Sequence, residues 1–237
     1  FNVIQFNSYT SQLYPSAVPV NGNTLQEAQR YARALIANGG TEMAGALDAA
    51  LVGSDNPNVI RQVVFMTDGS VGNEEELFGI IRKKLGDSRL FTIGIGSAPN
   101  SYFMTKAAEF GHGTFTYIGK VEEVNDKMSG LFRKLENPVL TDISVTLPGA
   151  IQGEMWPKQL PDLYAGEPVM LSAALNDVGS DMTITGSNGA AKWQTKLSLA
   201  ANKTESGVGV LWARKKIGAL MDAAHNNPEE AKKAIIT

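Results

Sequence analysis

The 237-residue sequence contains no cysteine, and this absence excludes several kinds of site. Disulfide scaffolds, zinc–thiolate centres and cysteine nucleophiles all need a thiol. A chain without thiols can exist in either redox environment, so the absence of cysteine does not identify the cellular compartment. The chain has two histidines, His112 and His225, and neither has a partner at metal-ligand spacing, so a transition-metal site is not expected.

The charge balance and the hydrophobic runs exclude two classes of partner. The chain carries 21 Lys+Arg against 24 Asp+Glu, a net charge of −3. A nucleic-acid surface normally needs a basic excess on one face, so no nucleic-acid partner is expected. No apolar run approaches the ~18 residues that cross a membrane, so we expect no membrane span in this chain.

Signatures of common enzymes are missing as well. The chain has no G-x-S-x-G, P-loop or H-E-x-x-H motif, so hydrolase and nucleotidase chemistry lacks a nucleophile or a phosphate cradle. The run Gly94–Pro99 is similar to a dinucleotide-binding loop, but Pro99 stands where the third glycine belongs, which favours a tight strand-to-helix turn. Because no nucleophile is paired with a general base, we predict a protein that is not an enzyme.

The sequence does contain an alternation of strand and helix patterns up to Asn137. The expected strands are residues 3–6, 13–20, 62–66, 90–95 and 114–118. The expected helices are residues 24–38 with Thr24 as the cap, 42–52, 73–85, 101–110 and 121–135. Such alternation is typical of a parallel sheet covered by helices on both faces, so we predict an α/β, doubly wound (Rossmann-like) domain over residues 1–136.

The pattern changes at Asn137-Pro138. Period-two alternation predicts an antiparallel, β-sandwich-like domain over residues 137–206. Its expected strands are residues 143–147, 169–173, 182–184 and 193–199. Residues 207–237 are expected to be a C-terminal helical segment, with one helix over 208–224 and another opening at Glu229. The three tryptophans are interpreted as packing anchors: Trp156, Trp193 and Trp212.

Two short segments carry the candidate chemistry, Gly39–Met43 (GGTEM) and Met66–Gly69 (MTDG). Ligands collect at the carboxyl ends of parallel strands, where Asp68 follows a strand and Thr41 lies in a loop that enters a helix. A hydroxyl and a carboxylate are hard oxygen ligands suited to Mg²⁺. Taken singly, the two residues are also compatible with an ordinary turn and an ordinary helix cap.

Together these segments resemble the von Willebrand factor A domain, with Phe1–Asn7 (FNVIQFN) and Phe91–Gly96 (FTIGIG) as further matches. They are most similar to the inter-alpha-trypsin inhibitor heavy-chain type. The segments Leu160–Pro168 and Leu211–Arg214, beyond the A domain, carry the same likeness. The resemblance therefore covers the chain from Phe1 to Met221.

The resemblance implies a metal-ion-dependent adhesion site in which Thr41 and Asp68 are two of the metal-binding elements. The family's third element, a DxSxS loop after a central strand, is absent from this sequence. We therefore expect a partial site that binds Mg²⁺ weakly or not at all in this chain, although Mg²⁺ would bind in an intact parent protein. In the family that central strand lies between the strands that match residues 3–6 and 63–66. Its absence leaves two sheet edges available for a homo-oligomer or a strand-swapped dimer.

The implied function is that of a cell-surface adhesion or protein-interaction module, with a protein ligand that offers a carboxylate to the metal. The alternative is a structural scaffold of a surface assembly without metal-dependent binding. The lack of cysteine and the ordinary composition favour a bacterial member of the family, and the resemblance implies an extracellular or cell-surface location. The chain opens directly on a strand pattern at Phe1, so we expect a piece of a longer protein in which a VIT domain precedes it.

Overall fold

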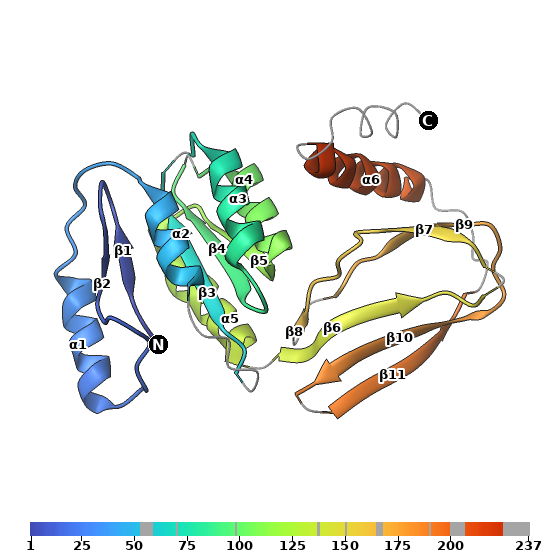
Figure 1. The fold of residues 1–237 in the computed structure, drawn as a ribbon, viewed down its shortest axis with the longest axis horizontal. Coiled ribbons are helices and arrows are strands. Elements are labelled where there is room, and N and C mark those ends of the chain that lie inside the picture. Colours follow the sequence, from blue (N-terminus) through green and yellow to red (C-terminus); the bar gives the residue numbers. More distant parts are fainter. Residues whose placement is uncertain are drawn as a thin grey trace. The chain divides into compact units, whose positions relative to one another are not determined.

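The computed structural model describes residues 1–52, 59–69, 71–97, 99–136, 138–149, 151–164, 168–189, 191–199 and 207–224. The chain divides into two compact units, Phe1–Leu131 and Phe132–Thr237 (Figure 1). The finer division into residues 1–136, 137–206 and 207–237 stays a prediction. Across the described ranges, no helix has both the length and the apolar character that a membrane crossing requires.

A three-stranded parallel sheet lies at the centre of the first unit. Its strands, in spatial order, are β3 (Gln62–Thr67), β4 (Arg89–Ile95) and β5 (His112–Ile118). Six consecutive residues of β4 are buried, as a parallel strand covered on both faces requires. The doubly wound α/β prediction is confirmed for this part of the chain.

Three helices of the first unit share one apolar cluster. They are α2 (Met43–Leu51), α3 (Glu74–Lys84) and α4 (Ser101–Phe110), and the helix α5 (Val124–Glu136) follows a 3₁₀ turn at Val121–Glu123. The cluster joins Leu47, Phe78 and Phe103, one from each of α2, α3 and α4, to Phe65 of β3. Burial of these side chains holds the helices on the sheet.

The first 42 residues form a separate layer that contains no buried residue. In it, β1 (Ile4–Phe6) and β2 (Thr10–Gln12) pair as an antiparallel hairpin, and α1 (Gly22–Arg33) follows. The hairpin is a sheet of its own and is not bonded to β3 (Figure 1). Among the described residues, no strand is hydrogen-bonded to β3 on the side away from β4.

Two local predictions in this layer are wrong. The second strand is Thr10–Gln12 and not residues 13–20, because proline interrupts the later segment. Asn21, not Thr24, caps α1: the Asn21 side chain accepts from the Thr24 amide, and the Thr24 hydroxyl accepts from the Asn21 amide. This reciprocal capping box places Thr24 inside the first turn, and the helix ends at Arg33.

The second unit is antiparallel, as predicted. One sheet has the order β11–β10–β6–β8, with β6 at Pro138–Thr146, β8 at Leu163–Tyr164, β10 at Asp181–Asn188 and β11 at Ala191–Ser198. A second sheet pairs β7 (Gly153–Trp156) with β9 (Ser172–Leu175), and α6 spans Val208–Ala224. The indole N–H of Trp212 donates to the Glu154 carbonyl at 3.0 Å, which ties α6 to β7.

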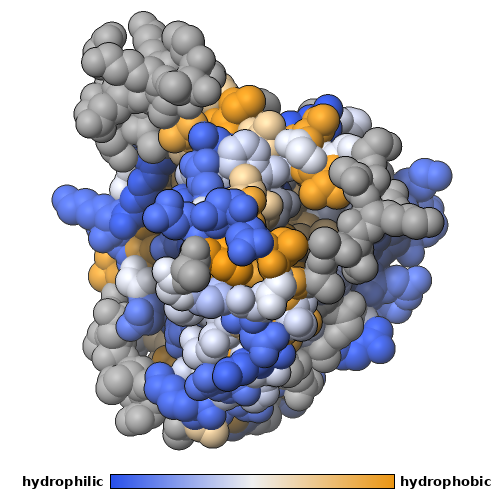
Figure 2. Space-filling view, turned by 90° about the vertical axis from the view of Figure 1, so that its right-hand side faces the viewer, coloured by the Kyte–Doolittle hydropathy of each residue, from blue (hydrophilic) through white to orange (hydrophobic). Residues whose placement is uncertain are grey.

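Several features of this unit differ from the sequence prediction. The short strands β7 and β8 were not expected, and the strand predicted at residues 169–173 is Ser172–Leu175. Trp156 is buried as expected, but Trp193 is 41% exposed on the edge strand β11 and is not a core anchor. Figure 2 shows hydrophobic residues interspersed among hydrophilic ones on the face that it presents. The helix predicted to open at Glu229 lies outside the described residues.

Leu47 tests the importance of the shared cluster, because its side chain is fully buried in α2. Leu47→Ala is expected to lower the free energy of unfolding by about 3 kcal/mol through lost burial and a residual cavity. Urea denaturation followed by circular dichroism measures this change. Leu35→Ala, at a leucine that is 45% exposed, is the matched control and is expected to cost less than about 1 kcal/mol. Equal losses in the two variants would contradict this account of the core.

Candidate functional site

The loop that enters α2 is hydrogen-bonded to the residues that follow β1. The Gly40 amide donates to the Ser8 hydroxyl at 2.8 Å, and the Glu42 amide donates to the Asn7 carbonyl at 2.8 Å. The Asn7 side-chain amide also donates to the Asn38 side-chain oxygen at 2.9 Å. These three bonds fix the loop against the carboxyl end of β1.

Thr41, the central residue of this loop, lies against the loop that follows β3. A Cβ atom placed on Gly69 would be 3.0 Å from the Thr41 methyl carbon and 3.1 Å from the Thr41 hydroxyl oxygen. Gly69 is therefore the residue that lets Thr41 approach, and Asp68 precedes it directly. Both Thr41 and Asp68 are exposed to solvent. The structure thus brings the two predicted segments together at one edge of the first unit.

Ser8 is a third oxygen-bearing residue at this edge, and it was not predicted from the sequence. Its hydroxyl contacts the same loop as Thr41, because it accepts from the Gly40 amide. The available signal was positional: Ser8 comes shortly after a strand, just as Asp68 does. We call the edge formed by Ser8, Thr41 and Asp68 the oxygen edge.

The oxygen edge provides oxygen ligands, the type that Mg²⁺ binds, but it provides only a few of them. Two hydroxyls and one carboxylate are hard oxygen donors, whereas Mg²⁺ prefers about six oxygen ligands in octahedral geometry. No group of three or more His, Asp or Glu side chains that could hold a metal ion occurs among the described residues. The donor set therefore fits Mg²⁺ in chemistry, and most of its coordination shell would have to come from water or from a partner.

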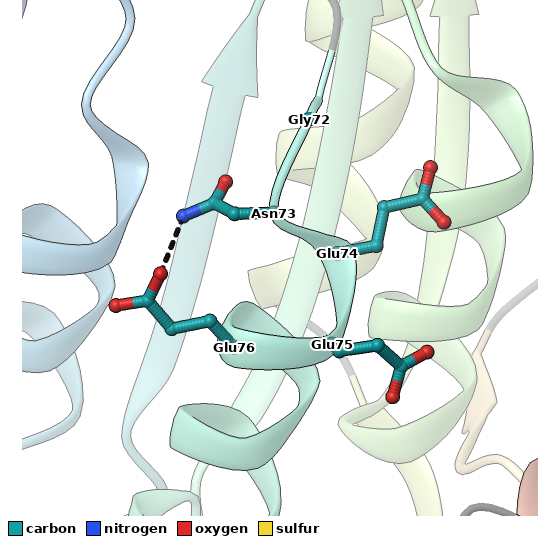
Figure 3. A pocket seen from close by; sticks show the side chains of 5 residues that line it. All are labelled: Gly72, Asn73, Glu74, Glu75 and Glu76. Atoms are coloured by element: carbon teal, nitrogen blue, oxygen red, sulfur yellow. Dashed lines mark hydrogen bonds between the residues drawn. The ribbon is translucent and has the colours of Figure 1, made fainter.

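An acidic hollow lies nearby along the chain, at the start of α3. Figure 3 shows that it is lined by Gly72, Asn73, Glu74, Glu75 and Glu76. Asn73 donates to the Glu76 carboxylate at 2.8 Å, and Asn100 donates to the Glu74 carboxylate. Carboxylates in the first turn stabilise the helix dipole, which explains these glutamates without a ligand.

Pro99, which follows β4, packs back against this strand at Gly94. A Cβ atom on Gly94 would lie 2.8 Å from the Pro99 Cβ atom and 3.1 Å from the Phe115 ring. Glycine is needed here because the following proline folds back onto the strand.

Comparison with known proteins identifies relatives of both units. A family model described as von Willebrand factor type A domain matches residues 1–117. A von Willebrand factor A domain-containing protein of Dictyostelium discoideum is 28% identical over 189 residues, which cover 78% of this chain and 20% of that protein. Inter-alpha-trypsin inhibitor heavy chain H4 of Homo sapiens is 25% identical over 223 residues, which cover 86% of this chain and 24% of that protein. The latter alignment is longer than the first unit, so it includes part of the second.

Among solved structures, a von Willebrand factor type A protein from Catenulispora acidiphila has the same fold. Its TM-score is 0.61 at 15% sequence identity, over 96% of this chain and 66% of that one. The chain spans only about a fifth to a quarter of the length of the curated relatives above.

Ser8→Ala tests whether the Ser8 hydroxyl holds the loop before α2. Loss of one hydrogen bond of about 1 kcal/mol is expected to speed hydrogen exchange at the Gly40 amide roughly fivefold. Exchange is measured by NMR. Ser16→Ala, at an exposed serine between β2 and α1, is the control and should leave the Gly40 amide unchanged. An unchanged rate in Ser8→Ala would show that the loop does not depend on this contact.

Gly69→Ala tests the approach of Thr41 to the loop after β3. The new methyl group would stand about 3 Å from the Thr41 side chain, closer than ordinary contact, so the Thr41 methyl resonance is expected to shift. Gly72→Ala is the matched control, because a Cβ atom there meets nothing within 4 Å. The same Thr41 shift in both variants, or in neither, would contradict the contact.

Proposed function

The chain belongs, through residues 1–117, to the von Willebrand factor type A domain family, and we propose that it binds a partner protein at the oxygen edge. The family is one of protein-interaction modules. The observation that supports this edge as the binding surface is the approach of Thr41 to Gly69, which places a hydroxyl beside the loop of Asp68. Both side chains are exposed and can reach a partner.

Binding at this edge is proposed to depend on Mg²⁺. The chain's own donors are the Thr41 hydroxyl and the Asp68 carboxylate, with Ser8 as a third candidate. A bound Mg²⁺ would attract a carboxylate from a partner protein, because it takes oxygen ligands and leaves exchangeable water positions. Since this chain supplies few of the ligands, its own affinity for Mg²⁺ is weak, and a partner carboxylate or a further segment completes the shell.

The proposal assigns no catalytic role to the chain. Interaction modules act by holding surfaces together, and the oxygen edge contains no nucleophile paired with a general base. The likeness to the heavy-chain type supports an extracellular or cell-surface location. The absence of cysteine supports a bacterial origin. There the ligand is an adhesion partner with an exposed carboxylate.

A second candidate function is a scaffold that organises a surface assembly without metal. It is favoured by the small number of acidic ligands at the oxygen edge, since the described residues hold no cluster of three metal-binding side chains. The two candidates differ in one property: metal ions bind the oxygen edge in the first and do not in the second.

Mn²⁺ distinguishes the two candidates, because it takes the same oxygen ligands as Mg²⁺ and broadens NMR signals of nearby nuclei. Mn²⁺ at millimolar levels is expected to broaden the amide signals of Thr41 and Gly69 first, and excess Mg²⁺ should restore them. Asp68→Ala is expected to weaken the broadening at least fivefold, because it removes the one carboxylate of the edge.

Asp181→Ala, at an exposed aspartate in the second unit, is the matched control and should change nothing at Thr41. Broadening centred on Glu74–Glu76 would place the ion in the acidic hollow and would contradict the proposed site. No broadening at either place, in this chain and in any longer polypeptide that contains it, would favour the scaffold.

A further inference from the structure

Strand β11 forms one edge of the four-stranded sheet in the second unit (Figure 1). It pairs with β10 over eight consecutive residues without a register shift, and seven of its eight residues are exposed. The opposite edge of the same sheet, β8, is two residues long. A long, regular edge strand is a template for an added strand, whereas a very short one is not.

The backbone groups of alternate residues in β11 point toward solvent. The Leu199 amide, just after β11, donates to the Ser180 carbonyl, just before β10, at 3.0 Å. Backbone direction alternates along an antiparallel strand, so the odd-numbered residues of β11 also bond to β10. The backbone groups of the even-numbered residues point away from β10, and we call this row the lysine edge: Lys192, Gln194, Lys196 and Ser198.

One face of β11 carries two positive charges. The side chains of Lys192 and Lys196 lie on the same face, because residues four apart in a strand share a face. Among the described residues neither lysine forms an ion pair, and Lys192 donates to the Ser187 hydroxyl at 3.4 Å. The strand itself contains no acidic residue. Its positive charge is therefore not neutralised within the strand.

The other face of β11 carries two large apolar side chains. Trp193 is 41% exposed and Leu197 is 50% exposed. Lysines on an edge strand protect it against unwanted pairing. Exposed apolar side chains on the same strand have the opposite effect, because their burial favours association. A partner strand that is acidic on one face and apolar on the other matches both faces of β11.

We propose that the lysine edge binds an extended segment of a partner protein, antiparallel to β11, in which acidic and apolar residues alternate. Two acidic residues, four positions apart, lie opposite Lys192 and Lys196. Apolar residues lie opposite Trp193 and Leu197 and cover them. Binding at this strand of the second unit requires no metal ion.

The carboxylates elsewhere in this sheet are too distant to repel such a segment. Asp142 of β6 lines a hollow together with Lys192 and Gln194, and Asp181 of β10 lies opposite Ser198. At about 4.8 Å per strand, an added strand is about 14 Å from β6 and about 10 Å from β10. Both distances exceed the Debye length of about 8 Å at physiological salt. The two lysines are one strand spacing away, so their attraction dominates.

A second copy of this chain does not match the lysine edge. Two β11 strands side by side would place four lysines on one face, with no acidic residue of either strand between them. Like charges on neighbouring strands destabilise their pairing. Charge complementarity therefore favours an acidic partner segment over self-association.

A synthetic peptide, Val-Glu-Val-Thr-Val-Glu-Val, labelled with a fluorophore at its N-terminus, is the probe. Antiparallel pairing with residues 191–197 places its two Glu residues opposite Lys196 and Lys192 and Val residues opposite Leu197 and Trp193. The control peptide has Lys in place of both Glu residues. It keeps the apolar residues and the preference for an extended strand and reverses only the charge.

Binding is measured by fluorescence polarisation in EDTA, so the result does not depend on whether metal binds at the oxygen edge. The acidic probe is expected to bind at least tenfold more tightly than the basic control. Its affinity should fall at least threefold when NaCl rises from about 20 mM to about 500 mM, because salt screens exposed charges.

Hydrogen exchange followed by NMR locates the bound peptide. Exchange is expected to slow at least fivefold at the amides of Lys192, Gln194 and Lys196, which gain an acceptor from the peptide. The amides of Trp193 and Thr195 should change less, because they already bond to β10. This alternation distinguishes strand addition from binding to one face of the sheet.

Two variants test the charge and the backbone separately. The double variant Lys192→Glu/Lys196→Glu should reverse the preference, so that the basic peptide binds more tightly. Lys127→Glu, at an exposed lysine of α5, is the matched control and should leave the preference unchanged. Gln194→Pro removes one outward amide, which an edge strand tolerates, and should weaken binding at least fivefold without changing the circular dichroism spectrum.

Four results would overturn the proposal. One is no binding of the acidic probe, and another is equal affinity for the acidic and basic peptides. A third is protection at the edge strands β2 or β8 in place of β11. The last is slow exchange at the outward amides without peptide, at high protein concentration or in a longer polypeptide that contains this chain. It would show that a second copy or another strand already fills the lysine edge.

Discussion

The packing of α2 against two separate sheets is the interaction on which the first unit depends. Phe6 belongs to the hairpin and Phe65 to the parallel sheet, and no backbone pairing connects these two sheets. The two rings stack on each other. Phe65 belongs to the apolar cluster that contains the fully buried Leu47 of α2, and Phe6 packs against this cluster. Burial of apolar surface therefore holds these two sheets together, whereas hydrogen bonds join the strands within each sheet.

The same packing positions the chemistry at the edge of the unit. The loop before α2 holds Thr41, and its bonds to Asn7 and Ser8 set the start of the helix against β1. Because α2 also packs on β3, the residues after β3 meet the same loop, and Gly69 leaves room for Thr41. The fold therefore determines the candidate site: the oxygen edge forms where the ends of β1 and β3 meet the start of α2.

Residues with a local signal were predictable from the sequence. The apolar run that forms β3 and the acidic start of α3 were predicted from residue pattern and helix dipole, and both elements occur where predicted; β3 is less buried than a central strand, because Met66 is exposed. Asp68 and Thr41 were identified because each stands at the end of such an element. Ser8 was missed, since its role comes from a contact with Gly40, which is 32 residues away in the sequence.

The errors share a physical cause. Thr24 and Asn21 are both good caps, and only the geometry of the chain before the helix selects Asn21. Trp193 has the alternation of a core position, but β11 is an edge strand, so its ring stays partly exposed. Periodicity tells which face of a strand is apolar; it does not tell whether another layer covers that face.

By itself, the sequence determined most helices and the parallel strands of the first unit, and the likeness of this unit to the von Willebrand factor type A domain, because hydrophobic period and short motifs are local properties. The tertiary structure decided which strand edges are paired and which are not. It also decided that Ser8, Thr41 and Asp68 share one edge, and that Phe6 of β1 stacks on Phe65 of β3 although the two strands belong to different sheets. Those outcomes depend on contacts between residues far apart in the chain, whose geometry is set by the joint packing of α2, β1 and β3.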